Sequence, residues 1–192
     1  MDLQKLRCWS SIAVGRQKVQ QLKLGAGQLH DLSQAFHAAL AQDPGFAEAC
    51  NNLGQMELEA GNPEKAFAWL NRSLAINPLE PQSLFVMGNF LNQVGRFDEA
   101  ASYLRRAVEL RPNFPEALNN LGNILLTLRR HDEGLQAFQR AIQSRPDYPE
   151  AYANLGNLQR EAKFPDLAEQ SMREAIRLKP DFAAAHSNLG NA

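Results

Sequence analysis

A 34-residue spacing of glycine and proline is the feature that most constrains the fold of this chain. From Ala47 onward, each 34-residue segment carries glycine at its eighth position and, where the segment is long enough, proline at its thirty-second. The glycines are Gly54, Gly88, Gly122, Gly156 and Gly190, and the prolines are Pro78, Pro112, Pro146 and Pro180. A fixed period of this length indicates repeated supersecondary units that stack and bury a shared core.

The residue types within each segment predict two amphipathic helices that pack closely together. A small residue recurs at position 20, and a larger apolar residue recurs at position 24. The two sets are Ala66, Ala100, Gly134 and Ala168, and Leu70, Leu104, Phe138 and Met172. A glycine inside a helix costs about 1 kcal/mol relative to alanine, so its recurrence at position 8 indicates that a second helix lies against it. Each proline disfavours helix at the preceding residue and so ends the second helix.

The register divides the chain into four complete units, 47–80, 81–114, 115–148 and 149–182. Residues 183–192 form the start of a truncated fifth unit. Residues 1–46 are expected to hold an N-terminal helix over much of 2–25 and a degenerate first repeat, in which Gln20 and Leu32 depart from the pattern. Phe36, Ala39 and Pro44 keep its phase. Because arrays normally end in a polar capping element, we expect either a longer parent protein or self-association through the uncapped C-terminal end.

This pattern resembles the tetratricopeptide repeat (TPR) family. The resemblance is carried by Leu121-Gly122, Gly134, Phe138, Ala141 and Pro146, together with their equivalents in the other units. It implies an all-α fold, an α-solenoid in which antiparallel helix pairs stack into a right-handed superhelix. First helices would line the concave face and second helices the convex face. Glu57 and Gln159 depart from the family at position 11, where a bulky residue is preferred, so local packing is in question there.

Composition narrows the class of protein further. The chain has 192 residues with a formal net charge of -1, so it offers no general positive field for nucleic acid or an acidic membrane. Basic residues interrupt the apolar residues of the first 18 positions, which excludes a secretory signal there, and no later stretch is long and apolar enough to span a membrane. The basic helix expected over 2–25 is interpreted as a solvated end helix, with a membrane-surface or nucleic-acid role as the alternative. Cys8 and Cys50 cannot build a disulfide framework, and we expect a cytoplasmic protein.

No catalytic or metal-binding pattern is found in the sequence. The histidines have no metal-ligand spacing, and the glycines all have a place in the repeat or in a turn. Acidic pairs such as Asp98-Glu99 fall at predicted helix starts, where the helix dipole favours negative charge. We therefore predict a chain that is not itself an enzyme and that needs no cofactor or metal.

Asparagine forms two stripes on the predicted first helices. The sixth position holds Asn52, Asn120, Asn154 and Asn188, and the ninth holds Asn89, Asn123 and Asn157. Val86 interrupts the sixth-position stripe. A primary amide offers both a donor and an acceptor, as a peptide unit does, so a ladder of amides could bind the backbone of an extended peptide. Each bond would contribute only about 0.5–1.5 kcal/mol, so several units must act together. The alternative is that these amides bond to neighbouring repeats or to water.

The sixth-position stripe is similar to the asparagine ladder in the repeat arm of O-linked N-acetylglucosamine transferases. That resemblance implies peptide contacts at Asn52, Asn120, Asn154 and Asn188. A second binding mode of the family, a clamp of basic residues on a carboxylate, is not expected, because positions 2 and 5 carry no basic residue in any complete unit. We predict a scaffold for a neutral or mildly basic protein segment. The alternatives are the substrate-recruiting arm of a larger glycosyltransferase or sulfotransferase, and a self-assembling solenoid.

Overall fold

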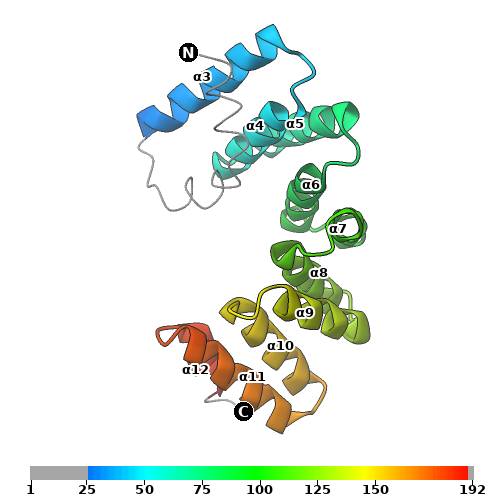
Figure 1. Ribbon diagram of the computed structural model, residues 1–192, viewed down its shortest axis with the longest axis vertical. Coiled ribbons are helices and arrows are strands. Elements are labelled where there is room, and N and C mark those ends of the chain that lie inside the picture. Colours follow the sequence, from blue (N-terminus) through cyan, green and yellow to red (C-terminus); the bar gives the residue numbers. More distant parts are fainter. Residues whose placement is uncertain (1–25, 190–192) are drawn as a thin grey trace. The chain divides into compact units, whose positions relative to one another are not determined.

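The computed structural model describes residues 26–189, which fold into α-helices without a strand in that range (Figure 1). The helices are α3 (Ala26–Gln42), α4 (Ala47–Glu59), α5 (Pro63–Ile76), α6 (Pro81–Gln93), α7 (Phe97–Leu110), α8 (Pro115–Thr127), α9 (His131–Ser144), α10 (Pro149–Glu161), α11 (Pro165–Leu178) and α12 (Ala183–Leu189). The predicted helix over 2–25 and residues 190–192 lie outside the described residues.

Four helix pairs begin at Ala47, Pro81, Pro115 and Pro149. The first helices α4, α6, α8 and α10 have 13 residues each, and the second helices α5, α7, α9 and α11 have 14. Proline opens five of these eight helices, where its missing N–H costs no intrahelical hydrogen bond. The predicted all-α, α-solenoid class is confirmed.

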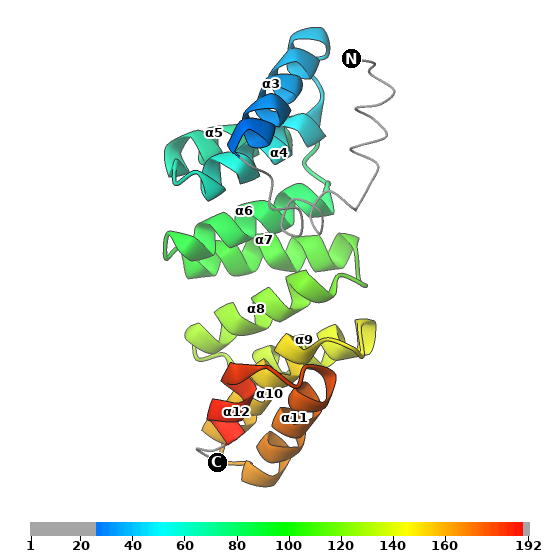
Figure 2. The same ribbon diagram turned by 90° about the vertical axis from the view of Figure 1, so that its left-hand side faces the viewer.

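The chain divides into two compact units, Met1–Leu79 (unit 1) and Glu80–Ala192 (unit 2). In the described part of unit 1, α3 packs on α4 around Phe36, Leu40 and Leu53. Leu32, a departure from the repeat pattern, is half-buried against this cluster. Unit 2 contains α6 to α12, whose succession is seen in Figure 2.

The position-8 glycines lie where a second helix approaches the first. A Cβ atom built on Gly88 would stand 2.8 Å from Leu104 Cγ, and one on Gly156 would stand 2.8 Å from Met172 Cε. Real Cβ contacts are longer than this, so an alanine at either place would force its neighbour to move. The close approach inferred from the glycine spacing is therefore present in the structure.

The two unusual residues at position 11 find polar partners. Glu57 Oε2 accepts a hydrogen bond of 2.8 Å from Asn62 Nδ2, and Gln159 Oε1 accepts one of 2.7 Å from the Ser171 hydroxyl. In the fourth repeat, a hydrogen bond between the two helices thus stands where a bulky apolar contact was expected. Because both polar groups of this pair are satisfied, partial burial there is tolerated.

The turns between paired helices each contain one residue in the left-handed region. Gly61 and Gly95 have φ of 77° and 78°, and the equivalent residues Arg129 and Lys163 have φ of 61° and 64°. Glycine adopts this conformation freely, whereas a residue with a Cβ atom does so at a cost. The third and fourth repeats therefore carry backbone strain at a place where the first two carry none.

Candidate functional site: the amide face of unit 2

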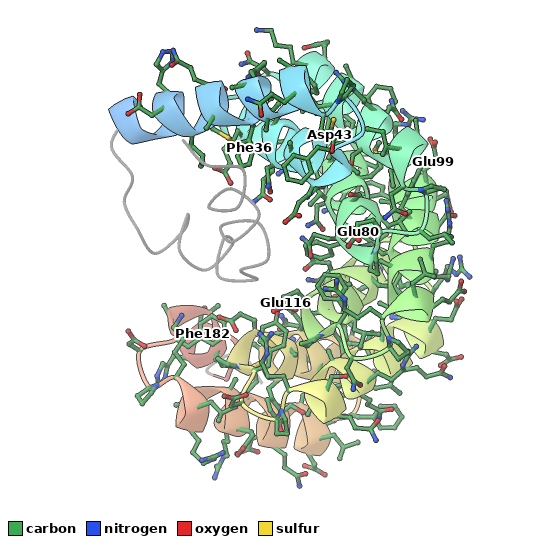
Figure 3. The ribbon with its side chains drawn as sticks, turned by 45° about the horizontal axis from the view of Figure 1, so that its top comes forward. Phe36, Asp43, Glu80, Glu99, Glu116 and Phe182 are labelled. Carbon is green, nitrogen blue, oxygen red and sulfur yellow. The ribbon has the colours of Figure 1, made fainter. Side chains whose placement is uncertain are left out.

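The first helices of unit 2 present amide side chains, which we call the amide face. It comprises Asn89, Asn92 and Gln93 of α6, Asn119, Asn120 and Asn123 of α8, and Asn154 and Asn157 of α10. Figure 3 shows Glu80 and Glu116, at the starts of α6 and α8, on one side of unit 2 and Glu99 of α7 on the other. Helical periodicity brings the polar positions of each first helix onto one surface, away from the second helices.

A hollow of about 290 Å³ lies on the amide face between α6 and α8. Its lining residues are Asn89, Asn92, Gln93, Asn120 and Asn123. All five carry primary amides, so the hollow offers hydrogen-bond donors and acceptors without a formal charge. A charged group placed there would lose hydration without gaining a counter-ion, which favours an uncharged polar ligand.

Two hydrogen bonds connect neighbouring repeats across the amide face. Asn120 Nδ2 donates to Asn89 Oδ1 at 2.8 Å, which joins α8 to α6. Asn154 Nδ2 donates to Asn119 Oδ1 at 2.9 Å, which joins α10 to α8. Each bond fixes which end of both amides points inward. The Asn89–Asn120 pair thereby keeps one amide nitrogen and one amide oxygen for a ligand at the edge of the hollow.

The structure places the predicted site residues in different environments. Asn89, Asn120 and Asn123 line the same hollow, whereas Asn154 lies one repeat further along. Asn157 Oδ1 is buried and has no hydrogen-bond partner among the described residues. Asn52 is half-buried on α4 of unit 1, and the side chain of Asn188 lies outside the described residues.

Three residues of the amide face were not predicted. Asn92 and Gln93 occupy the last turn of α6 and line the hollow. Asn119 is only 5% exposed, and it is the acceptor for Asn154. Asparagine also stands at the fifth position in Asn51, so a recurring fifth-position amide was the available signal for Asn119. No repeated pattern marks Asn92 and Gln93.

The carboxylates at the starts of the first helices are paired with cations from the ends of second helices. Glu116 pairs with Arg145, Glu150 with Lys179 at 3.9 Å, and Glu80 with Arg111 at 3.8 Å. In each case the cation also lies over the ring of the aromatic residue three positions later: Phe114, Tyr148 or Phe182. These ion pairs are partly exposed and contribute little stability, but they neutralise the acidic residues beside the amide face.

Burial and nearby charge keep the Tyr148 phenol protonated. Desolvation, followed by the carboxylates of Glu116 and Glu150, raises the pKa of Tyr148 to about 12. The ring is therefore a neutral platform for the Arg145 guanidinium, whose plane centre lies 4.9 Å from the ring centroid. This packing gives Tyr148 a structural role.

Other chemistry is sparse in the part of the chain that the structure describes. No group of three or more His, Cys, Asp or Glu side chains is placed to hold a metal ion within residues 26–189. Burial raises the pKa of the Cys50 thiol, which keeps it in the protonated, less reactive form. None of the helices in the described range is both long and apolar enough to cross a bilayer.

Comparisons with known proteins agree with this architecture. A sequence profile described as "Tetratricopeptide repeat" matches residues 21–81 and 91–149, and a second profile with the same description matches 149–182. A search of curated proteins by sequence found no match.

Several solved structures have the same fold. MamA has 20% sequence identity and a TM-score of 0.72, over 90% of this chain and 98% of its own. YrrB, described as "a TPR protein with an unusual peptide-binding site", has 24% identity and a TM-score of 0.70, over 84% and 83%. MamA 41-end from Desulfovibrio magneticus RS-1 has 26% identity and a TM-score of 0.69, over 76% and 82%. The resemblance to O-linked N-acetylglucosamine transferases stays a prediction.

Proposed function

Because the chain belongs to the tetratricopeptide repeat family, we propose that it is a protein-interaction scaffold that binds an extended, uncharged peptide segment on the amide face of unit 2. The observation that carries this proposal is the Asn89–Asn120 pair beside the hollow between α6 and α8. The predicted asparagine ladder would contribute the contacts, with Asn154 and Asn157 extending it along α10.

The chemistry of the pair suits a peptide backbone. After Asn120 Nδ2 has bonded to Asn89 Oδ1, the amide nitrogen of Asn89 is left as a donor and the amide oxygen of Asn120 as an acceptor, and together they complement one peptide unit. A carboxylate or phosphate could use only the donor, and an ammonium group only the acceptor. The internal bond also holds both side chains in place before a ligand arrives, which lowers the entropy cost of binding.

The electrostatics of the face support an uncharged segment. The neighbouring carboxylates Glu116 and Glu150 are already paired with Arg145 and Lys179, so little charge is left to attract a basic ligand. The structural likeness to YrrB, whose description names a peptide-binding site, supports a peptide as the class of ligand. Two alternatives are kept: the chain could be the substrate-recruiting arm of a larger transferase, or it could be a self-assembling solenoid.

A peptide selection would test the proposal. Random 12-residue peptides displayed on phage would be selected on the immobilised protein, and the best binder would be synthesised with a fluorescent label. Fluorescence anisotropy would then compare the wild type with Asn89→Ala/Asn120→Ala. Loss of two hydrogen bonds of about 0.5–1.5 kcal/mol each predicts a dissociation constant roughly 5- to 140-fold higher.

The matched control is Gln139→Ala, which removes an exposed amide from α9, a second helix. This variant should bind the peptide as the wild type does. Equal affinity of the wild type and the Asn89/Asn120 variant would refute the proposed site, provided that their thermal melting curves coincide.

A further inference from the structure

The turn between α10 and α11 differs chemically from the two equivalent turns before it in unit 2. Positions 16 and 19 hold Arg96 and Glu99 in the second repeat, and Arg130 and Glu133 in the third. Both pairs form ion pairs at 2.6 Å across the first turn of the second helix. In the fourth repeat, the same two positions hold Phe164 and Leu167. A repeated ion pair is thus replaced by two apolar side chains.

These apolar side chains are open to solvent. Phe164 is 57% exposed and Leu167 is 47% exposed. Ala162 and Pro165 in the same turn are also exposed, and we call these four residues the apolar turn. Residues at i and i+3 lie side by side on a helix, so Phe164 and Leu167 are neighbours, as the ion-paired residues are in the other repeats. Two large apolar side chains exposed next to each other offer apolar area that a partner could bury.

The charges next to the patch complement one another. Lys163 and Asp166 alternate with the apolar residues, and neither forms an ion pair within the described residues. A two-fold axis that passes between Lys163 and Asp166 would bring Lys163 of one copy to Asp166 of the other, and the reverse. A surface with this property is self-complementary, as a two-fold interface requires.

We propose that the apolar turn is a self-association surface, on which a second copy of this chain docks with two-fold symmetry. Phe164 and Leu167 form the buried centre, and Lys163 and Asp166 form two symmetric ion pairs at the edge. A patch of four residues is small compared with about 800 Å² per partner in a stable dimer. We therefore expect a weak association, at or below the small end of the range of interface sizes.

The variant Phe164→Arg/Leu167→Glu is the central test, because it rebuilds the ion pair that the third repeat has at Arg130 and Glu133. Its fold should be kept, which a melting curve would verify. Sedimentation equilibrium of the full chain would be measured from about 10 µM to 1 mM. The wild type should rise from the monomer mass of 21.4 kDa toward twice that value, whereas the variant should stay at the monomer mass.

Charge exchange tests the two-fold arrangement. Lys163→Asp alone and Asp166→Lys alone should each weaken association about 3- to 10-fold, since each places like charges opposite one another. The double exchange Lys163→Asp/Asp166→Lys should restore it, because the pairs form again with reversed sign.

Two results would overturn the proposal. One is a wild-type mass that stays at the monomer value up to 1 mM, which would mean that the apolar turn does not bind a second copy. The other is an Arg/Glu variant that associates as strongly as the wild type, which would move self-association to another surface.

Discussion

The substitution Gly122→Ala tests whether the repeat glycines serve close helix packing. A Cβ atom on Gly122 would lie 2.5 Å from Phe138 Cε1 and 2.7 Å from Phe138 Cδ1. Phe138 is fully buried, so its ring cannot move into solvent. Overpacking of this kind costs about 1–3 kcal/mol, and the better helix propensity of alanine returns about 1 kcal/mol. The difference is a net loss of up to about 2 kcal/mol in the free energy of unfolding. Because the Phe138 ring is enclosed, we expect the upper half of this range, about 1–2 kcal/mol.

Gly134→Ala is the matched control, because Gly134 is also in a helix and also fully packed. There the nearest atom to an added Cβ would be Gly122 O at 3.4 Å, an ordinary contact distance. This variant should gain about 0.5–1 kcal/mol from helix propensity alone. The other complete repeats carry Ala66, Ala100 and Ala168 at this position.

Thermal unfolding followed by circular dichroism would separate the two variants. A change of 1 kcal/mol shifts the midpoint by about 2–4 °C in a chain of this size. Gly122→Ala should therefore melt about 2–8 °C below the wild type, and Gly134→Ala about 1–4 °C above it. If Gly122→Ala melted at or above the temperature of Gly134→Ala, the packing explanation of the glycine period would be wrong.

Three further predictions concern the turns, one tyrosine and one thiol. Arg129→Gly and Lys163→Gly should each raise the free energy of unfolding by up to about 1 kcal/mol, because they relieve the strain of a left-handed backbone conformation, whereas Gly95→Ala should lower it. Urea titration would measure these changes. An unchanged unfolding midpoint for all three variants would contradict the prediction. The pKa of Tyr148 is about 12, compared with an ordinary value of 10, so the folded state holds its proton where the unfolded state releases it. Stability should therefore fall as pH rises from about 10 to 12, and Tyr148→Phe should show a smaller fall in pH-dependent melting; an equal fall would remove Tyr148 as the cause. In a Cys8→Ser background, Cys50 should react with a thiol reagent only at the rate of unfolding, because its side chain is buried and protonated. Rapid reaction of the native protein would contradict this prediction and would show that α4 opens locally.

The 34-residue period by itself determines the all-α, α-solenoid class of this chain. Gly88 and Gly156 predicted close helix contacts, and a Cβ atom added to either glycine would indeed lie only 2.8 Å from Leu104 or Met172. This succeeds because repeat stability depends on short-range features, namely small residues at helix contacts, prolines at helix boundaries, and interfaces between adjacent repeats.

Pairing across repeats was decided only by the tertiary structure. Asn120 and Asn154 share the sixth position, yet Asn120 donates to the ninth-position Asn89 and Asn154 to the fifth-position Asn119. Which partner is within reach depends on how adjacent first helices are placed relative to one another, and the packing between repeats sets that placement. The exposure of Phe164 and Leu167 could not be predicted from the sequence either, because apolar residues in the first turn of a helix can be buried or exposed. The packing of the neighbouring helices leaves both side chains exposed to solvent, and only the tertiary structure shows this.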